Sequence, residues 1–105
     1  MATAKQHSGG VITSLCGTKH PDEQVTCAQV ADRLLSVKGV KASFVAGINT
    51  EGKTVISARS LGEVNVQIIM EKFNGGGHLT TAAAQVDMPP EDAIDKILEM
   101  MEEEQ

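Results

Sequence analysis

The sequence predicts an α/β fold, a two-layer sandwich with helices packed on a mixed β-sheet in the order β-α-β-β-α-β-α. Two observations support this prediction. Runs of alternating or β-branched residues are interleaved with runs whose apolar residues recur at helical spacing, and glycine or proline stands at most boundaries. The chain has 105 residues, of which 41% are hydrophobic, so it is long enough to bury one core without disulfides or metals.

The chain begins with a predicted strand and a predicted helix. Residues 9–16 are rich in β-branched side chains and are entered through two glycines, which predicts a strand. Pro21 suits the first turn of a helix, and the apolar residues that follow recur at helical spacing as far as Leu35. Gly39 is expected to end this helix in the left-handed conformation.

A β-hairpin is predicted next. Apolar residues alternate with small or polar ones from Val40 to Ile48, and the strand period resumes from Lys53 to Arg59. The intervening residues 49–52 are Asn-Thr-Glu-Gly, a composition typical of tight turns. The two strands are therefore expected to form one antiparallel pair, with Arg59 at the end of the second strand.

The second half of the chain predicts a helix, a strand and a final helix. Asn65 is suited to cap a short helix whose apolar residues recur as far as Phe73. Residues 82–88 are expected to form a strand, although their alanines leave its start less defined. Pro89 then opens an amphipathic helix whose apolar side is expected to face the core.

One domain accounts for most of the chain. Residues 1–8 are polar and are expected to form a flexible N-terminal segment or a linker remnant, and residues 9–105 a single domain. No apolar run approaches the ~20 residues of a membrane span, and the two cysteines suit small buried hydrophobes in a reducing compartment. The net charge of −5 and the scarcity of aromatic residues argue against a protein that binds long nucleic acids.

The run Asn74-Gly75-Gly76-Gly77-His78 is the most informative stretch of the sequence. Consecutive glycines cost backbone entropy and add no side chain to a core, so they suit a place where a ligand approaches the main chain. Several backbone N–H groups can then point at one anion, and the His78 imidazole can add a hydrogen bond or a positive charge. The alternative is a flexible loop with an exposed histidine.

Arg59 and Ser60 follow the predicted hairpin and form a second candidate site. The guanidinium group is a planar fork that binds phosphate oxygens in pairs, and Ser60 adds a hydroxyl beside it in sequence. If the sheet places this strand end beside the glycine loop, Arg59 and His78 converge on one pocket. The alternative is a surface ion pair, since Glu63 and Glu71 are close in sequence.

Three segments resemble the DHH-associated C-terminal domain of DHH-family phosphoesterases, in particular that of GdpP-type cyclic-di-AMP phosphodiesterases. They occur in the family's order, and the resemblance extends over nearly the whole chain from the first predicted strand onward. The segments are Val55-Ile56-Ser57-Ala58-Arg59-Ser60, Leu61-Gly62-Glu63-Val64-Asn65-Val66, and Gly75-Gly76-Gly77-His78 with the alanine run that follows.

The resemblance implies a domain that binds substrate. In this family the domain closes over a separate DHH domain, which carries two divalent metals, usually manganese, and which this chain lacks. It further implies that Arg59 and Ser60 engage a phosphate, that the three glycines present backbone amides, and that His78 contacts the phosphate or the adenine side. The chain alone is not expected to be an active hydrolase. The resemblance also implies a membrane-anchored parent with this domain on the cytoplasmic side.

Two positions depart from the family pattern. Asn74 stands where relatives often have a further glycine, and Ala84 stands where many have glycine. Asparagine tolerates the left-handed conformation, so the loop is expected to keep its shape. The remaining cysteines and histidines are not expected to bind zinc, because their spacing matches no common ligand pattern. They are His7, Cys16, His20 and Cys27.

We therefore expect the substrate-binding domain of a bacterial cyclic-di-AMP phosphodiesterase. Its partners would be cyclic-di-AMP or a linear dinucleotide and the DHH domain of the same polypeptide, with no long nucleic acid. A second hypothesis keeps the fold and changes the substrate to short oligonucleotides, as in nanoRNase-type or RecJ-type relatives. A third is a noncatalytic interaction module that binds a partner or forms a homodimer through a sheet edge, with the glycine loop incidental.

Overall fold

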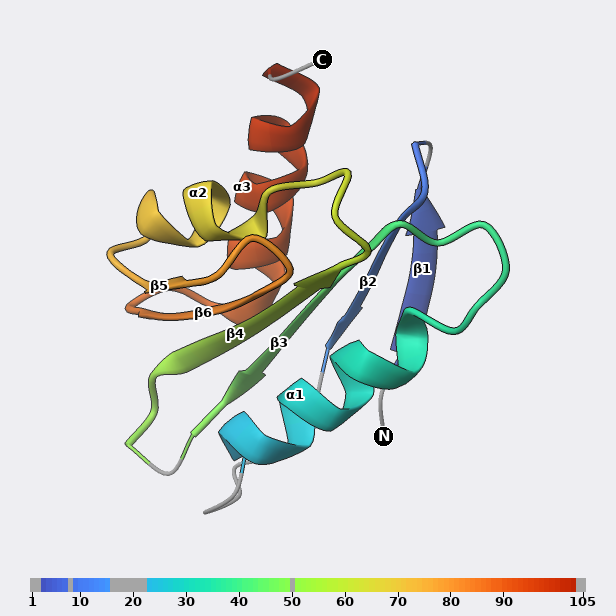
Figure 1. Ribbon diagram of the computed structural model, residues 1–105. Helices are drawn as coiled ribbons and strands as arrows, with labels where there is room; N and C mark the ends of the chain where they lie inside the picture. Colours follow the sequence, from blue (N-terminus) through green and yellow to red (C-terminus); the bar gives the residue numbers. More distant parts are fainter. Residues whose placement is uncertain (1–2, 8, 16–22, 50, 104–105) are drawn as a thin grey trace.

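The computed structural model describes residues 3–7, 9–15, 23–49 and 51–103, which fold around one six-stranded sheet (Figure 1). The strands are β1 (Thr3–His7), β2 (Val11–Leu15), β3 (Ala42–Ile48), β4 (Thr54–Ser60), β5 (Gly76–Gly77) and β6 (Thr81–Val86), and the helices are α1 (Glu23–Leu34), α2 (Val66–Glu71) and α3 (Pro90–Glu103). The strands lie in the order β1-β2-β3-β4-β6-β5. Only β2 and β3 pair in parallel among these strands, so the described sheet is mixed.

Helices lie on both faces of the sheet. α1 packs on β3 and β4 from one side, while α2 and α3 cover the opposite side, as Figure 1 shows. The predicted α/β class, a mixed sheet with packed helices, is confirmed. The sheet is the middle of three layers where the sequence analysis expected two, because periodicity reveals the apolar side of a helix but not which face of the sheet it covers.

The central strands are buried on both faces, which divides the core into two clusters. On β3, the adjacent residues Phe44 and Val45 are both fully buried, and they point to opposite sides because strand side chains alternate. Phe44 belongs to the larger cluster under α2 and α3, and Val45 to the smaller one under α1. Ser43 is also buried, and its hydroxyl donates to the Ala31 carbonyl at 2.7 Å, so its burial leaves the hydroxyl satisfied.

The observed order contains two strands beyond those predicted. Sequence patterns place residues 1–8 in a flexible segment, whereas residues 3–7 form β1, an edge strand antiparallel to β2. At the other edge, two glycines form β5 against β6. Neither strand has an alternating apolar pattern from which it could be predicted. Both are held chiefly by main-chain hydrogen bonds, which do not depend on the side chains. The predicted helix start at Pro21 lies outside the described residues.

Asparagines stand at both ends of α2. The Asn65 side chain accepts the Ile68 N–H at 3.3 Å, so the predicted N-cap is confirmed. After the helix, Asn74 has φ +64°. This is the left-handed conformation that asparagine tolerates at a position where relatives often have glycine. The Gly75 N–H donates to the Met70 carbonyl at 2.8 Å. The end of α2 therefore leads the chain directly into the glycine loop.

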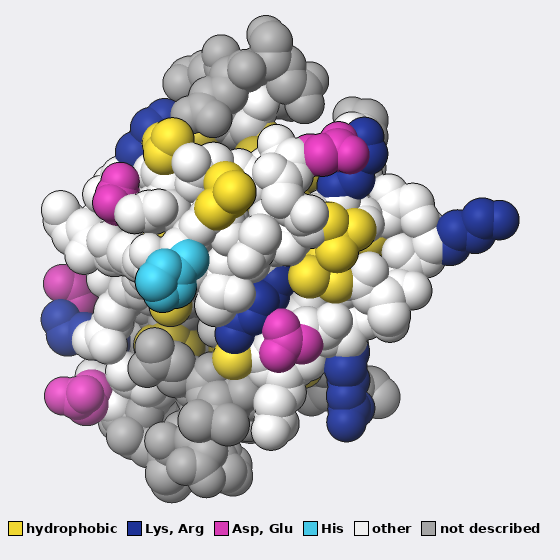
Figure 2. All heavy atoms as spheres, viewed as in Figure 1, with side chains coloured by type: hydrophobic (Ala, Val, Ile, Leu, Met, Phe, Trp, Pro, Cys, Tyr) yellow, Lys and Arg dark blue, Asp and Glu magenta, His cyan; other side chains and the backbone are white. Residues whose placement is uncertain are grey.

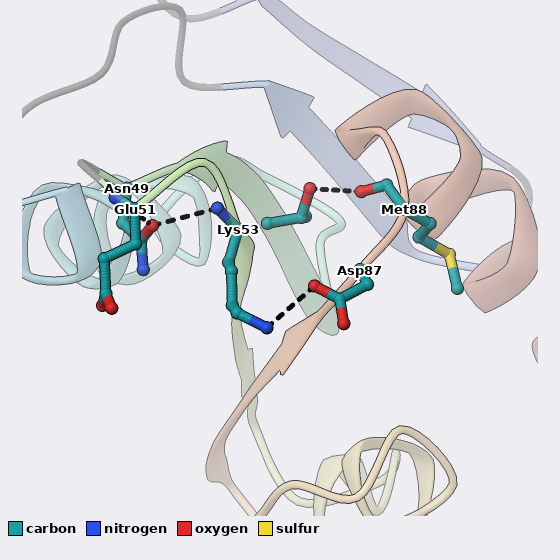
Figure 3. A network of polar contacts seen from close by, with 6 residues as sticks. Asn49, Glu51, Lys53, Asp87 and Met88 are labelled. Carbon is teal, nitrogen blue, oxygen red and sulfur yellow. Dashed lines mark hydrogen bonds and ion pairs between the residues drawn. The ribbon is translucent and has the colours of Figure 1, made fainter.

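A polar network ties the β3–β4 hairpin to the end of β6 (Figure 3). The Asn49 side-chain oxygen accepts the Lys53 N–H at 3.0 Å, and Lys53 Nζ donates to Asp87 Oδ1 at 2.9 Å. Beside them the Thr54 hydroxyl donates to the Met88 carbonyl. The turn predicted between the two strands is thus connected to a distant part of the chain.

We expect the stabilising effect of the Lys53–Asp87 pair to disappear at high pH. The hydrogen bond to Asp87 and its charge, with a smaller contribution from Glu51, raise the pKa of Lys53 above its ordinary value of 10.5. The pair therefore stabilises fully below pH 10.5, and its contribution is lost as the pH rises through the raised pKa. Lys53→Gln should lower the thermal midpoint slightly at neutral pH, since the Lys53 and Asp87 side chains are 42% and 79% exposed.

Thermal unfolding of the Lys53→Gln variant and the unchanged chain across this pH range measures the effect. Lys96→Gln, at an exposed position of α3, is the control for the loss of one positive charge. A stability difference between Lys53→Gln and the unchanged chain that grows as the pH rises would contradict the assignment.

Candidate functional site

Strand pairing brings the end of β4 and the glycine loop to opposite sides of β6. Arg59 of β4 pairs with Thr81 of β6, and the next residues of β6 pair with Gly76 and Gly77 of β5. One residue further, the His78 N–H donates to the Thr81 carbonyl at 2.6 Å. Arg59 and His78 therefore both neighbour Thr81, although they are distant along the chain.

Arg59 and Thr81 lie on the face of the sheet that carries α1. Their neighbours Ala58 and Ala82 belong to the core under α2 and α3, and strand side chains alternate between faces. On this face Thr81 is exposed and Ala83 is half-buried. We call the surface formed by Thr81 and Ala83 the shelf. Figure 2 shows this side of the molecule, with a histidine side chain near a basic side chain that touches an acidic one.

The Arg59 guanidinium is held at two of its three nitrogens. Nε donates to Asp32 Oδ1 of α1 at 2.8 Å, and Nη1 donates to the Ala58 carbonyl at 2.9 Å. The third nitrogen, Nη2, has no hydrogen-bond partner among the described residues. The arginine side chain is 14% exposed. An ion pair is therefore present, but its partner comes from α1, and nearby Glu63 pairs instead with Lys41.

Ser60 is buried, and its hydroxyl serves the backbone. The hydroxyl donates to the Val64 carbonyl at 2.7 Å and accepts the Gly62 N–H at 3.2 Å, with the Leu79 carbonyl 3.4 Å away. By strand alternation its side chain lies on the opposite face of β4 from Arg59. The structure thus places Ser60 where it joins the end of β4 to the turn between β5 and β6.

The three glycines of the loop have different surroundings. A methyl group at Gly75 would lie 2.2 Å from the Ala83 carbonyl oxygen, and one at Gly77 would lie 2.4 Å from the Thr81 carbonyl oxygen. At Gly76 no atom lies within 4 Å of the corresponding position. Gly75 and Gly77 therefore allow β5 to approach β6 closely, whereas Gly76 is the glycine with open space beside it.

Asp32 and the two shelf residues, Thr81 and Ala83, lie beside Arg59 in the structure and were not predicted from the sequence. Asp32 is an acid on the exposed side of an amphipathic helix, and no local signal distinguishes it from other such residues. The period of two along β6 could have grouped Thr81 with Ala83, but only the strand pairing connects them with Arg59. Ala84, one of the departures from the family pattern, is buried on the other face.

The described residues contain no group of three or more His, Cys, Asp or Glu side chains that could hold a metal ion. Cys27 is fully buried in the core under α1, and His7 Nε2 lies 2.9 Å from Thr13 Oγ1. Cys16 and His20 lie outside the described residues. Over the same part of the chain, no helix combines the length and the apolar character needed to cross a membrane.

Comparison with known sequences gives a family and several relatives. The DHHA1 domain model matches residues 8–105. The chain is 61% identical over 64 residues to the cyclic-di-AMP phosphodiesterase GdpP of Geobacillus thermodenitrificans, a match over 61% of this chain and 10% of that protein. It is 54% identical over 83 residues to the cyclic-di-AMP phosphodiesterase PdeA of Listeria monocytogenes, covering 76% and 12%. The chain thus spans about a tenth of the length of these curated relatives.

Two solved structures share the fold. An exopolyphosphatase-related protein from Bacteroides fragilis has a TM-score of 0.74 at 24% identity, over 92% of this chain and 30% of that one. The pGpG-specific phosphodiesterase PggH from Vibrio cholerae has a TM-score of 0.58 at 15% identity, over 90% and 33%. At these identities the likeness concerns the fold alone.

Proposed function

This chain belongs to the DHHA1 domain family, which is related to cyclic-di-AMP phosphodiesterases and other DHH phosphoesterases, and we propose that it binds the substrate of a bacterial cyclic-di-AMP phosphodiesterase. The matched relatives at 54% and 61% identity are named for this activity. A separate DHH domain of the same polypeptide would hold the divalent metals, since no three His, Cys, Asp or Glu side chains of the described residues are grouped to hold a metal ion. The parent protein would be membrane-anchored, with this domain on its cytoplasmic side.

One observation supports the site more than any other: Arg59 and His78 flank Thr81 at the edge of the shelf. A phosphate lying there would meet the Nη1–Nη2 edge of the guanidinium, which binds two oxygens at once. The Gly75 N–H is already donated to the Met70 carbonyl, so any backbone donor from the three glycines would come from Gly76 or Gly77. The exposed His78 imidazole would add a side-chain donor. Ser60 would act indirectly, by fixing the turn between β5 and β6.

The charge of the chain favours a small ligand. With a net charge of −5, the molecule as a whole repels anions at long range. Salt screens that repulsion beyond about 10 Å, so an anion can still be held by a few groups at short range. Binding of this kind suits a dinucleotide and disfavours a long nucleic acid, which needs a basic surface along its backbone. The domain would then contribute binding and orientation to the reaction.

His78→Ala in the full-length protein is expected to raise the KM for cyclic-di-AMP about threefold to tenfold, since one hydrogen bond contributes about 0.5–1.5 kcal/mol. The kcat should stay nearly unchanged if the contact forms equally in the bound substrate and in the transition state. Steady-state kinetics measure both constants. His7→Ala is the matched control, because His7 lies on β1 at the other edge of the sheet. A KM unaltered by His78→Ala would argue against this site.

Competition experiments on the same protein distinguish the substrate classes. Cyclic-di-AMP is expected to displace a labelled linear dinucleotide at lower concentration than the unlabelled linear form does. The reverse order would favour the second hypothesis, in which the domain belongs to an enzyme that acts on short oligonucleotides.

The third hypothesis, an interaction module, is tested by NMR. An interaction module would leave the amide resonances of residues 75–78 unchanged during titration with either nucleotide, and it would form a dimer that depends on concentration.

A further inference from the structure

We propose that Asp32 is a positioning residue for the anion site, because its carboxylate fixes the Arg59 guanidinium with one edge left available for a phosphate. The inference rests on the function proposed above. It concerns a residue of α1 that lies outside the strand end and the glycine loop. Its basis is that some N–H donors of Arg59 already have acceptors in the structure while others do not.

The guanidinium has five N–H donors, and the structure uses two of them. The single N–H of Nε goes to Asp32 Oδ1 at 2.8 Å, and one N–H of Nη1 goes to the Ala58 carbonyl at 2.9 Å. Three donors remain, one on Nη1 and two on Nη2, for which the described residues supply no acceptor. Nη1 and Nη2 together form the edge that binds phosphate oxygens in pairs.

The two acceptors hold the arginine from different elements. Ala58 precedes Arg59 on β4, whereas Asp32 projects from α1, which packs on β3 and β4. A long side chain fixed in this way has already lost much of its rotamer freedom before the ligand arrives. Binding then costs less side-chain entropy than it would for an arginine that moves freely.

Asp32 also places a negative charge near the proposed anion, which acts in the opposite direction. Its side chain is 64% exposed, so water and salt weaken the effect of the charge, whereas the hydrogen bond acts at contact distance. We therefore expect the loss of positioning to outweigh the removal of the charge. Asp32→Asn separates the two effects, since an amide oxygen still accepts the Nε–H while the charge is gone.

The experiment measures the KM for cyclic-di-AMP in the full-length protein that carries this domain. Asp32→Ala is expected to raise the KM about threefold to tenfold at unchanged kcat, the cost of ordering one long side chain on binding. Asp32→Asn should stay within about twofold of the unchanged protein, because the acceptor is retained. In a protein that already carries Arg59→Ala, the further change Asp32→Ala should have no effect, since Asp32 acts through Arg59.

Asp87→Ala is the matched control. It removes the carboxylate of another exposed ion pair, at 2.9 Å, far along the chain from Arg59, and is expected to leave the KM unchanged. Thermal midpoints of the variants that change only Asp32 or Asp87 should agree closely, because both acids are exposed.

Three results would overturn the inference. The first is a KM for Asp32→Ala equal to or below that of the unchanged protein. The second is an equal increase in KM for Asp32→Ala and Asp32→Asn. The third is an increase in KM on Asp32→Ala that is just as large in the protein that carries Arg59→Ala. Failure of the proposed function has a different signature, because Arg59→Ala alone would then leave the KM unchanged.

Discussion

Gly77→Ala is expected to lower the free energy of unfolding by about 3 kcal/mol, through overpacking and backbone strain together. The added methyl group would lie 2.4 Å from the Thr81 carbonyl oxygen and 2.5 Å from the Ala82 Cα. Both neighbours are backbone atoms of β6, so neither can turn aside as a flexible side chain would. The φ of +147° adds to the cost, since residues with a side chain rarely adopt it.

Gly76→Ala provides the matched control for this prediction. The position lies in open space, and its φ is not positive, so the same change is expected to alter stability by no more than about 0.5 kcal/mol. Urea unfolding of the two variants beside the unchanged chain gives the comparison directly. Equal midpoints for Gly76→Ala and Gly77→Ala would show that the close approach of β5 to β6 does not constrain the loop.

Arg59→Ala in the full-length protein is expected to raise the KM for cyclic-di-AMP about 10-fold to 100-fold, since a hydrogen bond to a charged group contributes about 1.5–3 kcal/mol. Arg59→Lys should recover only part of this loss, because an ammonium group lacks the planar fork. Thermal unfolding should show a lower midpoint for Arg59→Ala, because the side chain is only 14% exposed and its loss also removes packing, so the KM is measured well below that midpoint.

Arg33→Ala is the control for Arg59→Ala. Arg33 is an exposed arginine next to Asp32 on α1, so its loss removes the same charge from the same region of the molecule. Its KM is expected to equal that of the unchanged protein. If Arg33→Ala and Arg59→Ala raised the KM equally, the effect would reflect overall charge, and the specific role of Arg59 would be rejected.

Part of the candidate site could be predicted from the sequence because some of its residues contribute little to a hydrophobic core. An arginine at a strand end and three glycines before a histidine stand out from the chain on chemical grounds alone. The structure shows that Arg59 and His78 both neighbour Thr81 through main-chain pairing, and their convergence on one ligand stays a prediction. Ser60 illustrates the opposite case. Adjacent residues of a strand point to opposite faces, so its place beside Arg59 in sequence separates the two side chains in space.

Local patterns determined the kind and the order of most elements. The period of two along β3 and β4, the cap at Asn65 and the left-handed Asn74 each act over a few neighbouring residues, so the sequence alone sufficed to place them. Only the tertiary structure decided which face each helix covers, that β1 and β5 complete the sheet, and that Asp32 holds an arginine 27 positions away. These features depend on hydrogen bonds, ion pairs and packing between distant segments, and periodicity within one segment carries no information about them.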